Sequence, residues 1–147
     1  MRKMLTVAMV AGLAALAQAR GDVSVLDELM PVPTKVERLA GSAPAAALAN
    51  VTVSREAVAG APAATVDEAY VLEIASDGVK IKALGEKGER WARVTLGQLA
   101  KLAEGGPVPC CRITDWPYLK WRGCMLDTSR NYVPPQELKD FIDMMAA

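Results

Sequence analysis

Alternating hydrophobic and polar positions in the middle of the chain predict a β-hairpin. Two β-rich runs, Tyr70–Ile74 and Val79–Ala83, are joined by the turn residues Ser76–Gly78, in which Asp-Gly is a strong hairpin signal. In the second run the apolar side chains fall on one face and both lysines on the other. The pair therefore predicts a sheet with one face toward a core and the other toward water.

Two further strands are expected before this hairpin. Lys35–Leu39 alternates polar and apolar residues as a half-buried strand does, and Val51–Val53 is a short β-branched run. The segments Gly41–Ala49 and Ala57–Ala64 are rich in Ala, Pro and Gly, so we expect loops on both sides of the shorter strand.

After the hairpin the pattern changes to a helical one. Gly85–Gly88 predicts a turn and Arg90–Val94 a short strand. Thr95 and Gln98 then fit a capping box, which predicts a helix of about ten residues with one apolar face. Val108–Ile113 returns to a strand pattern. Strands first and then a helix on one face predict an α+β layer domain with a mainly antiparallel sheet.

The C-terminal residues predict a separate strand-loop-helix unit. The apolar run Trp121–Leu126 is typical of a strand, and the polar corner Asp127–Arg130 follows it. Pro134 and Pro135 suit the start of an amphipathic helix that carries one apolar stripe. One such unit is not a fold by itself, because a strand covered by a helix needs neighbouring strands.

The N-terminus predicts an export signal. Arg2 and Lys3 form a basic start, Met4–Leu16 is apolar but too short to span a bilayer comfortably, and Ala17–Ala19 fits a small-x-small cleavage site. The alternative is an uncleaved N-terminal anchor, against which the short apolar run and the cleavage site argue. We expect residues 1–19 to be a signal peptide and the mature protein to be periplasmic or secreted, with no membrane contact after cleavage.

Charge and composition exclude several classes of function. The chain carries 17 basic and 17 acidic residues, so nothing predicts nucleic acid or an anionic membrane as a partner. Its 147 residues include no histidine, which excludes a nucleophile activated by histidine and a metal held by histidine. No nucleophile elbow, phosphate-binding glycine motif or paired carboxylates occur, so we expect no catalytic residue, cofactor or metal site in this chain.

The three cysteines, Cys110, Cys111 and Cys124, cannot all pair with one another. An odd count in an exported protein is compatible with a reactive thiol. All three lie in apolar strand-like runs, which favours small buried side chains, and a Cys110–Cys124 disulfide stays an open alternative. Cys110 and Cys111 are adjacent on a predicted strand and point to opposite faces, which argues against a shared metal ion.

The motifs YVLEI, DGVKI, TLGQL, ITDWP and WRGCMLDTSRNYVP occur in an order that resembles the N-terminal part of the family 20 glycoside hydrolases, the β-N-acetylhexosaminidases. The resemblance covers about half the chain from Tyr70 onward. It implies a non-catalytic α/β domain over residues 20–115, and a TIM barrel that begins at residues 116–147 with one strand and one helix. A barrel needs about 250 residues and eight strands, so the barrel here would be incomplete.

The resemblance also implies a reaction. The family removes terminal N-acetylglucosamine or N-acetylgalactosamine with retention, by a substrate-assisted mechanism in which the 2-acetamido oxygen attacks the anomeric carbon. An Asp that orients the amide and a Glu that protonates the leaving oxygen lie on a later barrel strand, outside these 147 residues. We therefore expect this chain to be inactive alone, and an N-acetylhexosamine-terminated glycan to be a partner only of the complete enzyme.

One family role transfers to a matching position, the arginine of W-R-G, here Arg122, which would donate to hydroxyls of the sugar ring. Without the resemblance a structural salt bridge inside the barrel is the better expectation for this residue. Asp127, Ser129 and Arg130 also match the family, and we assign them to the corner between strand and helix. The family has a histidine where this chain has Asn131, so any contact made by that histidine does not transfer.

Two interpretations of function follow. The first is the N-terminal fragment of an exported β-N-acetylhexosaminidase, a glycosidase of carbohydrate metabolism. The second is a stand-alone secreted accessory or binding module with no catalytic activity. A downstream polypeptide that completes the barrel in trans is a weaker third alternative.

Overall fold

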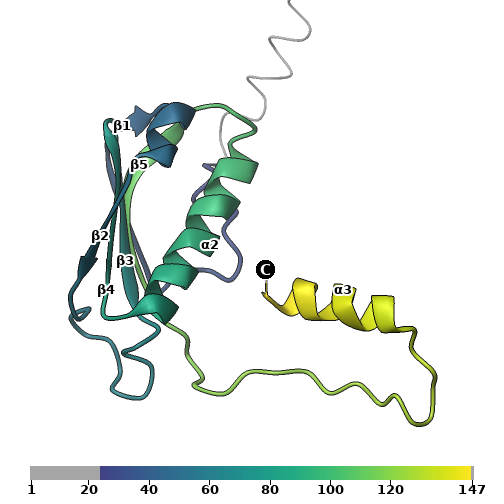
Figure 1. Cartoon of the computed structure of the whole chain (residues 1–147). Helices are drawn as coiled ribbons and strands as arrows, with labels where there is room; N and C mark the ends of the chain where they lie inside the picture. Colours follow the sequence, from purple (N-terminus) through teal and green to yellow (C-terminus); the bar gives the residue numbers. More distant parts are fainter. Residues whose placement is uncertain (1–23, 147) are drawn as a thin grey trace, which may run out of the picture.

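The computed structural model describes residues 24–146, so the predicted signal peptide lies outside the described residues. The elements in chain order are β1 (Lys35–Ala43), the 3-10 helix η1 (Ala45–Ala49), β2 (Val51–Arg55), β3 (Tyr70–Ala75), β4 (Gly78–Ala83), α2 (Glu86–Leu102), β5 (Val108–Asp115) and α3 (Pro135–Ala146). Figure 1 shows five strands in one sheet, α2 against one face of it, and α3 apart from the sheet. Within the described part of the chain, no helix is long and apolar enough to cross a membrane.

The sheet has the strand order β1-β5-β3-β4-β2 and is mainly antiparallel, as predicted. β3 and β4 form the predicted hairpin, with Leu72 opposite Ile81 and Ala75 opposite Gly78. β1 and β3 each pair antiparallel with β5, and only the edge strand β2 runs parallel to its neighbour, β4. The fold is therefore an α+β arrangement built on a mixed sheet.

The two faces of the sheet have opposite character, which confirms the prediction of one wet face. Leu72, Ile74 and Ile81 are buried in a core that lies between the sheet and α2. On the other face Glu73 lies opposite Lys80 and Arg112 and forms an ion pair with Arg112 at 2.6 Å. Strand residues alternate between faces, so one hydrophobic pattern determines both surfaces.

The helix α2 is longer than expected, and three predictions around its start are wrong. It has 17 residues, from Glu86 to Leu102, and it includes Arg90–Val94, which we predicted to be a strand. Thr95 lies inside the helix, so it forms no capping box. Ala92, Leu96 and Leu99 are buried at helical spacing against the sheet. This continuous stripe explains why the helix starts earlier than the Thr95 signal indicates.

The predicted turn at Gly85–Gly88 is also wrong, because Gly85 is the N-cap of α2 and Gly88 lies in its first turn. Gly88 is buried where the helix start meets the sheet. A Cβ atom added there would lie 2.3 Å from the carbonyl oxygen of Ala69 and 3.1 Å from Cβ of Ala83. The absence of a side chain at Gly88 therefore allows the close approach of α2 to the sheet.

The N-terminal strand is longer than predicted as well. β1 continues to Ala43, and η1 follows in the region that we expected to be a loop. The pairing of β1 with β5 is irregular between Arg38 and Ser42, where Gly41 has a φ of 92°. A glycine in this left-handed region lets the strand bulge and then resume its pairing.

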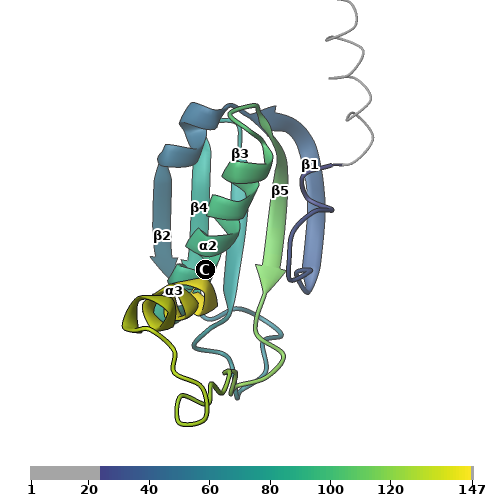
Figure 2. The ribbon, with the colours of Figure 1, turned by 90° about the vertical axis from the view of Figure 1, so that its right-hand side faces the viewer.

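Of the strand and the helix predicted for the C-terminal part, only the helix is present. α3 forms as expected, but Trp121–Leu126 forms no strand, and Trp121 and Met125 are 91% and 96% exposed. A lone strand without a hydrogen-bonding neighbour is not stable in water, and no described strand lies beside this run. Figure 1 shows the long extended connection between β5 and α3, and Figure 2 shows α2 in front of the sheet, with β1 and β2 at its two edges.

Candidate functional site

Arg122 lies in the extended connection between β5 and α3, and it contacts the sheet domain. Its Nη2 atom is 2.5 Å from Oε2 of Glu68, and its Nη1 donates to the carbonyl oxygen of Leu119. The guanidinium carbon lies 5.5 Å from the centroid of the Trp91 ring, within the range of a cation–π contact. For an arginine without a family role we expected a structural salt bridge inside the barrel. Arg122 does form a salt bridge, but its partner is Glu68 of the first domain. The predicted contact with a sugar stays a prediction.

Glu68 and Trp91 also contact each other directly. Trp91 lies in the second turn of α2, and its Nε1 donates to Oε2 of Glu68 at 2.9 Å. Glu68 lies in the loop just before β3, and its side chain is 12% exposed. A carboxylate so nearly enclosed needs donors, and the indole N–H and the guanidinium supply them.

Sequence patterns gave no sign of this cluster. Glu68 and Arg122 are 54 positions apart, and Trp91 belongs to the segment that we predicted to be a strand. No local spacing signals such a contact.

A groove of about 570 Å³ lies beside this cluster, between residues 29–34, α2 and residues 115–122. Several of its polar groups are already paired within the protein. The hydroxyl groups of Tyr70 and Thr95 are 2.6 Å apart, and Gln98 Nε2 donates to the carbonyl oxygen of Met30 at 2.9 Å. Asp115 Oδ1 accepts from both the backbone N–H and the hydroxyl of Thr34.

This groove offers no acid–base chemistry at neutral pH. Burial raises the pKa of the Tyr70 hydroxyl far above its ordinary value, so the phenol stays protonated and neutral. Asp115 is committed to Thr34 and lies 3.5 Å from the same phenol. The arrangement therefore holds the two walls of the groove together.

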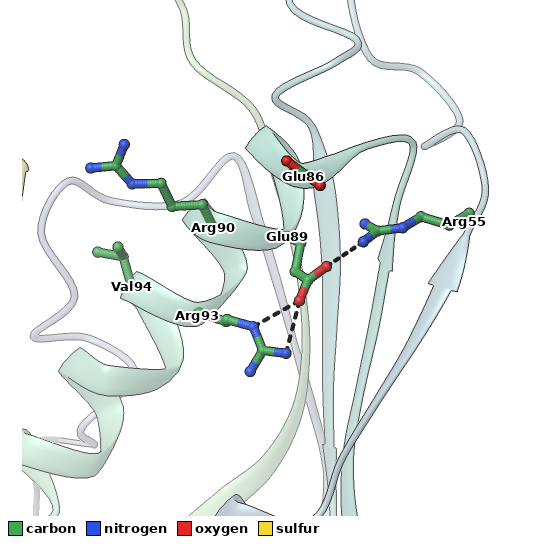
Figure 3. Close-up of a pocket in the computed structure, with 6 residues that line it drawn as sticks. All are labelled: Arg55, Glu86, Glu89, Arg90, Arg93 and Val94. Atoms are coloured by element: carbon green, nitrogen blue, oxygen red, sulfur yellow. Dashed lines mark hydrogen bonds and ion pairs between the residues drawn. The ribbon is translucent and has the colours of Figure 1, made fainter.

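A second pocket, shown in Figure 3, has a volume of about 510 Å³ and lies at the start of α2. At its centre Glu89 pairs with Arg55 of β2 at 2.6 Å and with Arg93 of the same helix at 2.8 Å. The hydrogen bonds from Arg93 and then from Arg55 hold the pKa of Glu89 below its usual range. The cluster fastens the edge strand β2 to the helix, which is a structural role.

The polar corner at Asp127 forms as predicted. Oδ1 of Asp127 accepts from the backbone N–H of Ser129 at 2.9 Å, from its hydroxyl at 3.0 Å and from the backbone N–H of Arg130 at 3.1 Å. The backbone hydrogen bonds from Arg130 and Ser129 lower the pKa of Asp127. This carboxylate organises the turn that precedes α3.

The cysteines divide into two kinds. Cys110 and Cys111 are buried, as predicted, whereas Cys124 is exposed, which contradicts the expectation that it is a small buried side chain. All three are free thiols, so the alternative of a Cys110–Cys124 disulfide is not realised in this structure. Cys124 is exposed because the strand expected around it does not form. Among residues 24–146, no group of three or more Cys, Asp or Glu side chains is placed to hold a metal ion.

Comparison with protein families gives two matches that follow one another along the chain. Residues 17–116 match the description "Glycosyl hydrolase family 20, domain 2", and residues 119–147 match "Glycosyl hydrolase family 20, catalytic domain". The second match covers only the start of that catalytic domain.

Individual relatives agree with these matches. A beta-hexosaminidase of Akkermansia muciniphila is 40% identical over 81 residues, which are 54% of this chain and 16% of that protein. A beta-N-acetylhexosaminidase of Cellulomonas fimi is 32% identical over 124 residues, which are 83% of this chain and 23% of that protein. The chain thus spans less than a quarter of the length of either relative.

Solved structures show the same likeness. The crystal structure of a beta-N-acetylhexosaminidase matches 77% of this chain and 23% of its own, with a TM-score of 0.61 and 33% identity. An exo beta-N-acetylglucosaminidase from Vibrio harveyi, solved with N-acetylglucosamine, matches 84% of this chain and 24% of its own, with a TM-score of 0.65; at 23% identity it supports the fold alone. Because the domain 2 match alone spans more than half of the chain, the protein belongs to glycosyl hydrolase family 20.

Proposed function

We propose that this chain is the N-terminal part of an exported β-N-acetylhexosaminidase, which removes terminal N-acetylglucosamine or N-acetylgalactosamine from glycans. The observation that carries the proposal is the catalytic-domain match over residues 119–147, directly after the match to domain 2. A separate binding module has no need of the first residues of a catalytic domain. The segment 1–19, with its basic start and apolar core, supports export.

In this proposal residues 116–147 are the first strand and helix of the catalytic barrel. Two features support the assignment. The run Trp121–Leu126 exposes large apolar side chains, and α3 has an apolar stripe in which Ile142 and Met145 are also exposed. Both surfaces suit a barrel, in which a strand is paired on both edges and its helix packs on the outside. Neighbouring barrel strands would supply the partners that Trp121–Leu126 lacks.

Arg122 would then be one donor group of the sugar-binding site. A planar guanidinium offers several N–H groups in a fixed plane, which suits adjacent hydroxyl oxygens of a pyranose ring. The catalytic Asp and Glu of the substrate-assisted retaining mechanism would come from a later strand. We therefore expect the 147-residue chain alone to be inactive.

The experiment compares this chain with the product of the same gene extended in frame by about 220 residues, enough to complete a barrel. The extended protein should hydrolyse a chromogenic N-acetylglucosaminide, and the 147-residue chain should not. Arg122→Lys in the extended protein should raise KM, because a lysine cannot donate in the same plane, while Arg112→Lys on the exposed sheet face serves as the control.

Two results would contradict the proposal: hydrolysis by the 147-residue chain itself, or an extended sequence that contains neither barrel strands nor an Asp-Glu pair. The second result would favour the stand-alone module. One observation already favours that alternative, since residues 35–115 form a five-stranded sheet with its own buried core.

A further inference from the structure

The contact between Arg122 and the first domain has a geometry that a sugar-binding arginine cannot keep. Nη2 of Arg122 pairs with Glu68, Nη1 donates to the carbonyl oxygen of Leu119, and the ring of Trp91 covers the guanidinium at 5.5 Å. Both terminal nitrogens and one face are therefore occupied. The adjacent hydroxyl groups of a pyranose need the same nitrogens.

We infer that Glu68 and Trp91 form a latch that holds Arg122, and with it the connection 116–122, against the first domain whenever the barrel is incomplete. The inference rests on the proposed function, because it concerns the arginine assigned to the sugar. The latched arginine and the sugar-bound arginine are mutually exclusive states. When the barrel is completed, contacts within the barrel must replace the Glu68 carboxylate as the partner of Arg122 before Arg122 can bind a sugar.

The receiving side of the latch has a hydrogen bond of its own. Trp91 Nε1 donates to Glu68 at 2.9 Å, so the carboxylate and the indole ring are already oriented toward each other. The Glu68 side chain is 12% exposed and that of Arg122 40% exposed. The carboxylate is thus largely withdrawn from water, and a cation that reaches it replaces lost solvation.

Neighbouring charges also attract the connection 116–122 toward the first domain. Lys87 pairs with Asp67 at 2.8 Å, and this hydrogen bond is the main reason why the pKa of Asp67 is lowered. Lys120, which belongs to the latched connection, contributes to the same lowering by its charge. Two adjacent carboxylates, Asp67 and Glu68, therefore attract two cations of one segment, Lys120 and Arg122.

The latch also accounts for the groove described above. Trp116, Tyr118 and Leu119 form one wall of it, and they belong to the connection that Arg122 anchors. Tyr118 is 97% exposed and Leu119 58% exposed, so these side chains bury little surface of their own. Trp116 is half-buried, so apolar packing contributes at that end of the wall, and the ion pair of Arg122 anchors the exposed end.

Limited trypsin digestion of the 147-residue protein, followed by mass spectrometry, tests the inference. Glu68→Gln keeps the size of the side chain and removes its charge, so cleavage after Lys120 and Arg122 should be about fivefold faster than in the wild type. Trp91→Phe, which removes the N–H and keeps a ring, should also speed these two cleavages. Cleavage after Arg112 in β5 reports on global stability in the same digestion and should be unchanged.

Glu73→Gln is the matched control, because Glu73 also loses an ion pair, to Arg112, on the far face of the sheet. It should leave the cleavage after Lys120 and Arg122 unchanged. Raised salt should speed these cleavages, relative to cleavage after the exposed Arg130, in the wild type but not in Glu68→Gln, because screening weakens only an existing ion pair.

Equal cleavage after Lys120 and Arg122 in the wild type and in Glu68→Gln would overturn the latch, as would an equal response to Glu73→Gln. Either result would leave the proposed hydrolase intact, since that is judged by the activity of the extended protein. Conversely, an inactive extended protein whose fragment shows the expected change in cleavage would refute the hydrolase and retain the latch.

Discussion

Replacing Gly88 by alanine should destabilise the domain, although alanine is the better helix former. An alanine Cβ would lie 2.3 Å from the carbonyl oxygen of Ala69, about 1 Å closer than an ordinary carbon–oxygen contact of about 3.3 Å. The carbonyl belongs to the backbone just before β3, so it cannot rotate away as a side chain can. The helix start must move instead, which also strains the hydrogen bond from Gly88 N–H to the Asp67 carbonyl oxygen.

The magnitude follows from two opposing terms. Overpacking against a fixed backbone atom costs about 3 kcal/mol, the upper part of the range for enlarged core residues. Alanine in place of glycine in a helix returns about 1 kcal/mol. We therefore expect Gly88→Ala to lower the free energy of unfolding by about 2 kcal/mol.

Gly97 provides the matched control in the same helix, because an added Cβ there meets nothing within 4 Å. Gly97→Ala should raise the free energy of unfolding by about 1 kcal/mol through helix propensity alone. Urea denaturation followed by circular dichroism measures both variants, and an unchanged slope would show that only stability differs. If Gly88→Ala proves as stable as the wild type, α2 does not approach the sheet as closely as described.

Two further predictions concern titratable groups. Burial raises the pKa of the Cys111 thiol from 9.0 to about 11. Between pH 9 and about pH 11 the unfolded chain therefore loses a proton that the folded chain keeps, so the free energy of unfolding falls as pH rises. Urea denaturation at several pH values gives the slope of the free energy of unfolding against pH. In Cys111→Ala this slope should be smaller than in the wild type by up to about 1.4 kcal/mol per pH unit, and an equal slope would contradict this assignment. Asp127→Ala should speed amide exchange at Ser129 and Arg130 without moving the urea midpoint, because the corner is exposed. Asp127→Asn keeps an acceptor oxygen, so it should speed this exchange less. Unchanged exchange in the alanine variant would show that Asp127 does not hold the turn.

The strands could be predicted from the sequence because their signals are local. In the β3–β4 hairpin, alternation and the Asp-Gly turn lie within fourteen consecutive residues, Tyr70–Ala83, and they agree with each other. The start of α2 lacked such agreement. Two glycines at its first turn indicate a turn when only neighbours in the chain are considered, and the reason for Gly88 is a contact with Ala69 across the fold.

The C-terminal unit shows a different limit. The run Trp121–Leu126 has the composition of a strand, but a strand also needs hydrogen-bonding partners, and none of the described strands is beside it. Its helix, α3, needs only its own backbone hydrogen bonds and forms as predicted. The pairing of Arg122 with Glu68 depends on where that unpaired segment comes to lie, which no pattern within the segment specifies.

The pairing of β1 with β5 sets an order of events during synthesis. Lys35 lies opposite Thr114, so the first strand made must wait for nearly the last residue of the sheet before it finds its partner. Contacts between residues so distant in the chain form slowly, because a long loop must close first. A nascent chain halted before β5 would hold β1 as an unpaired strand, available to chaperones. The sheet can close only as the residues that match the catalytic domain begin to emerge.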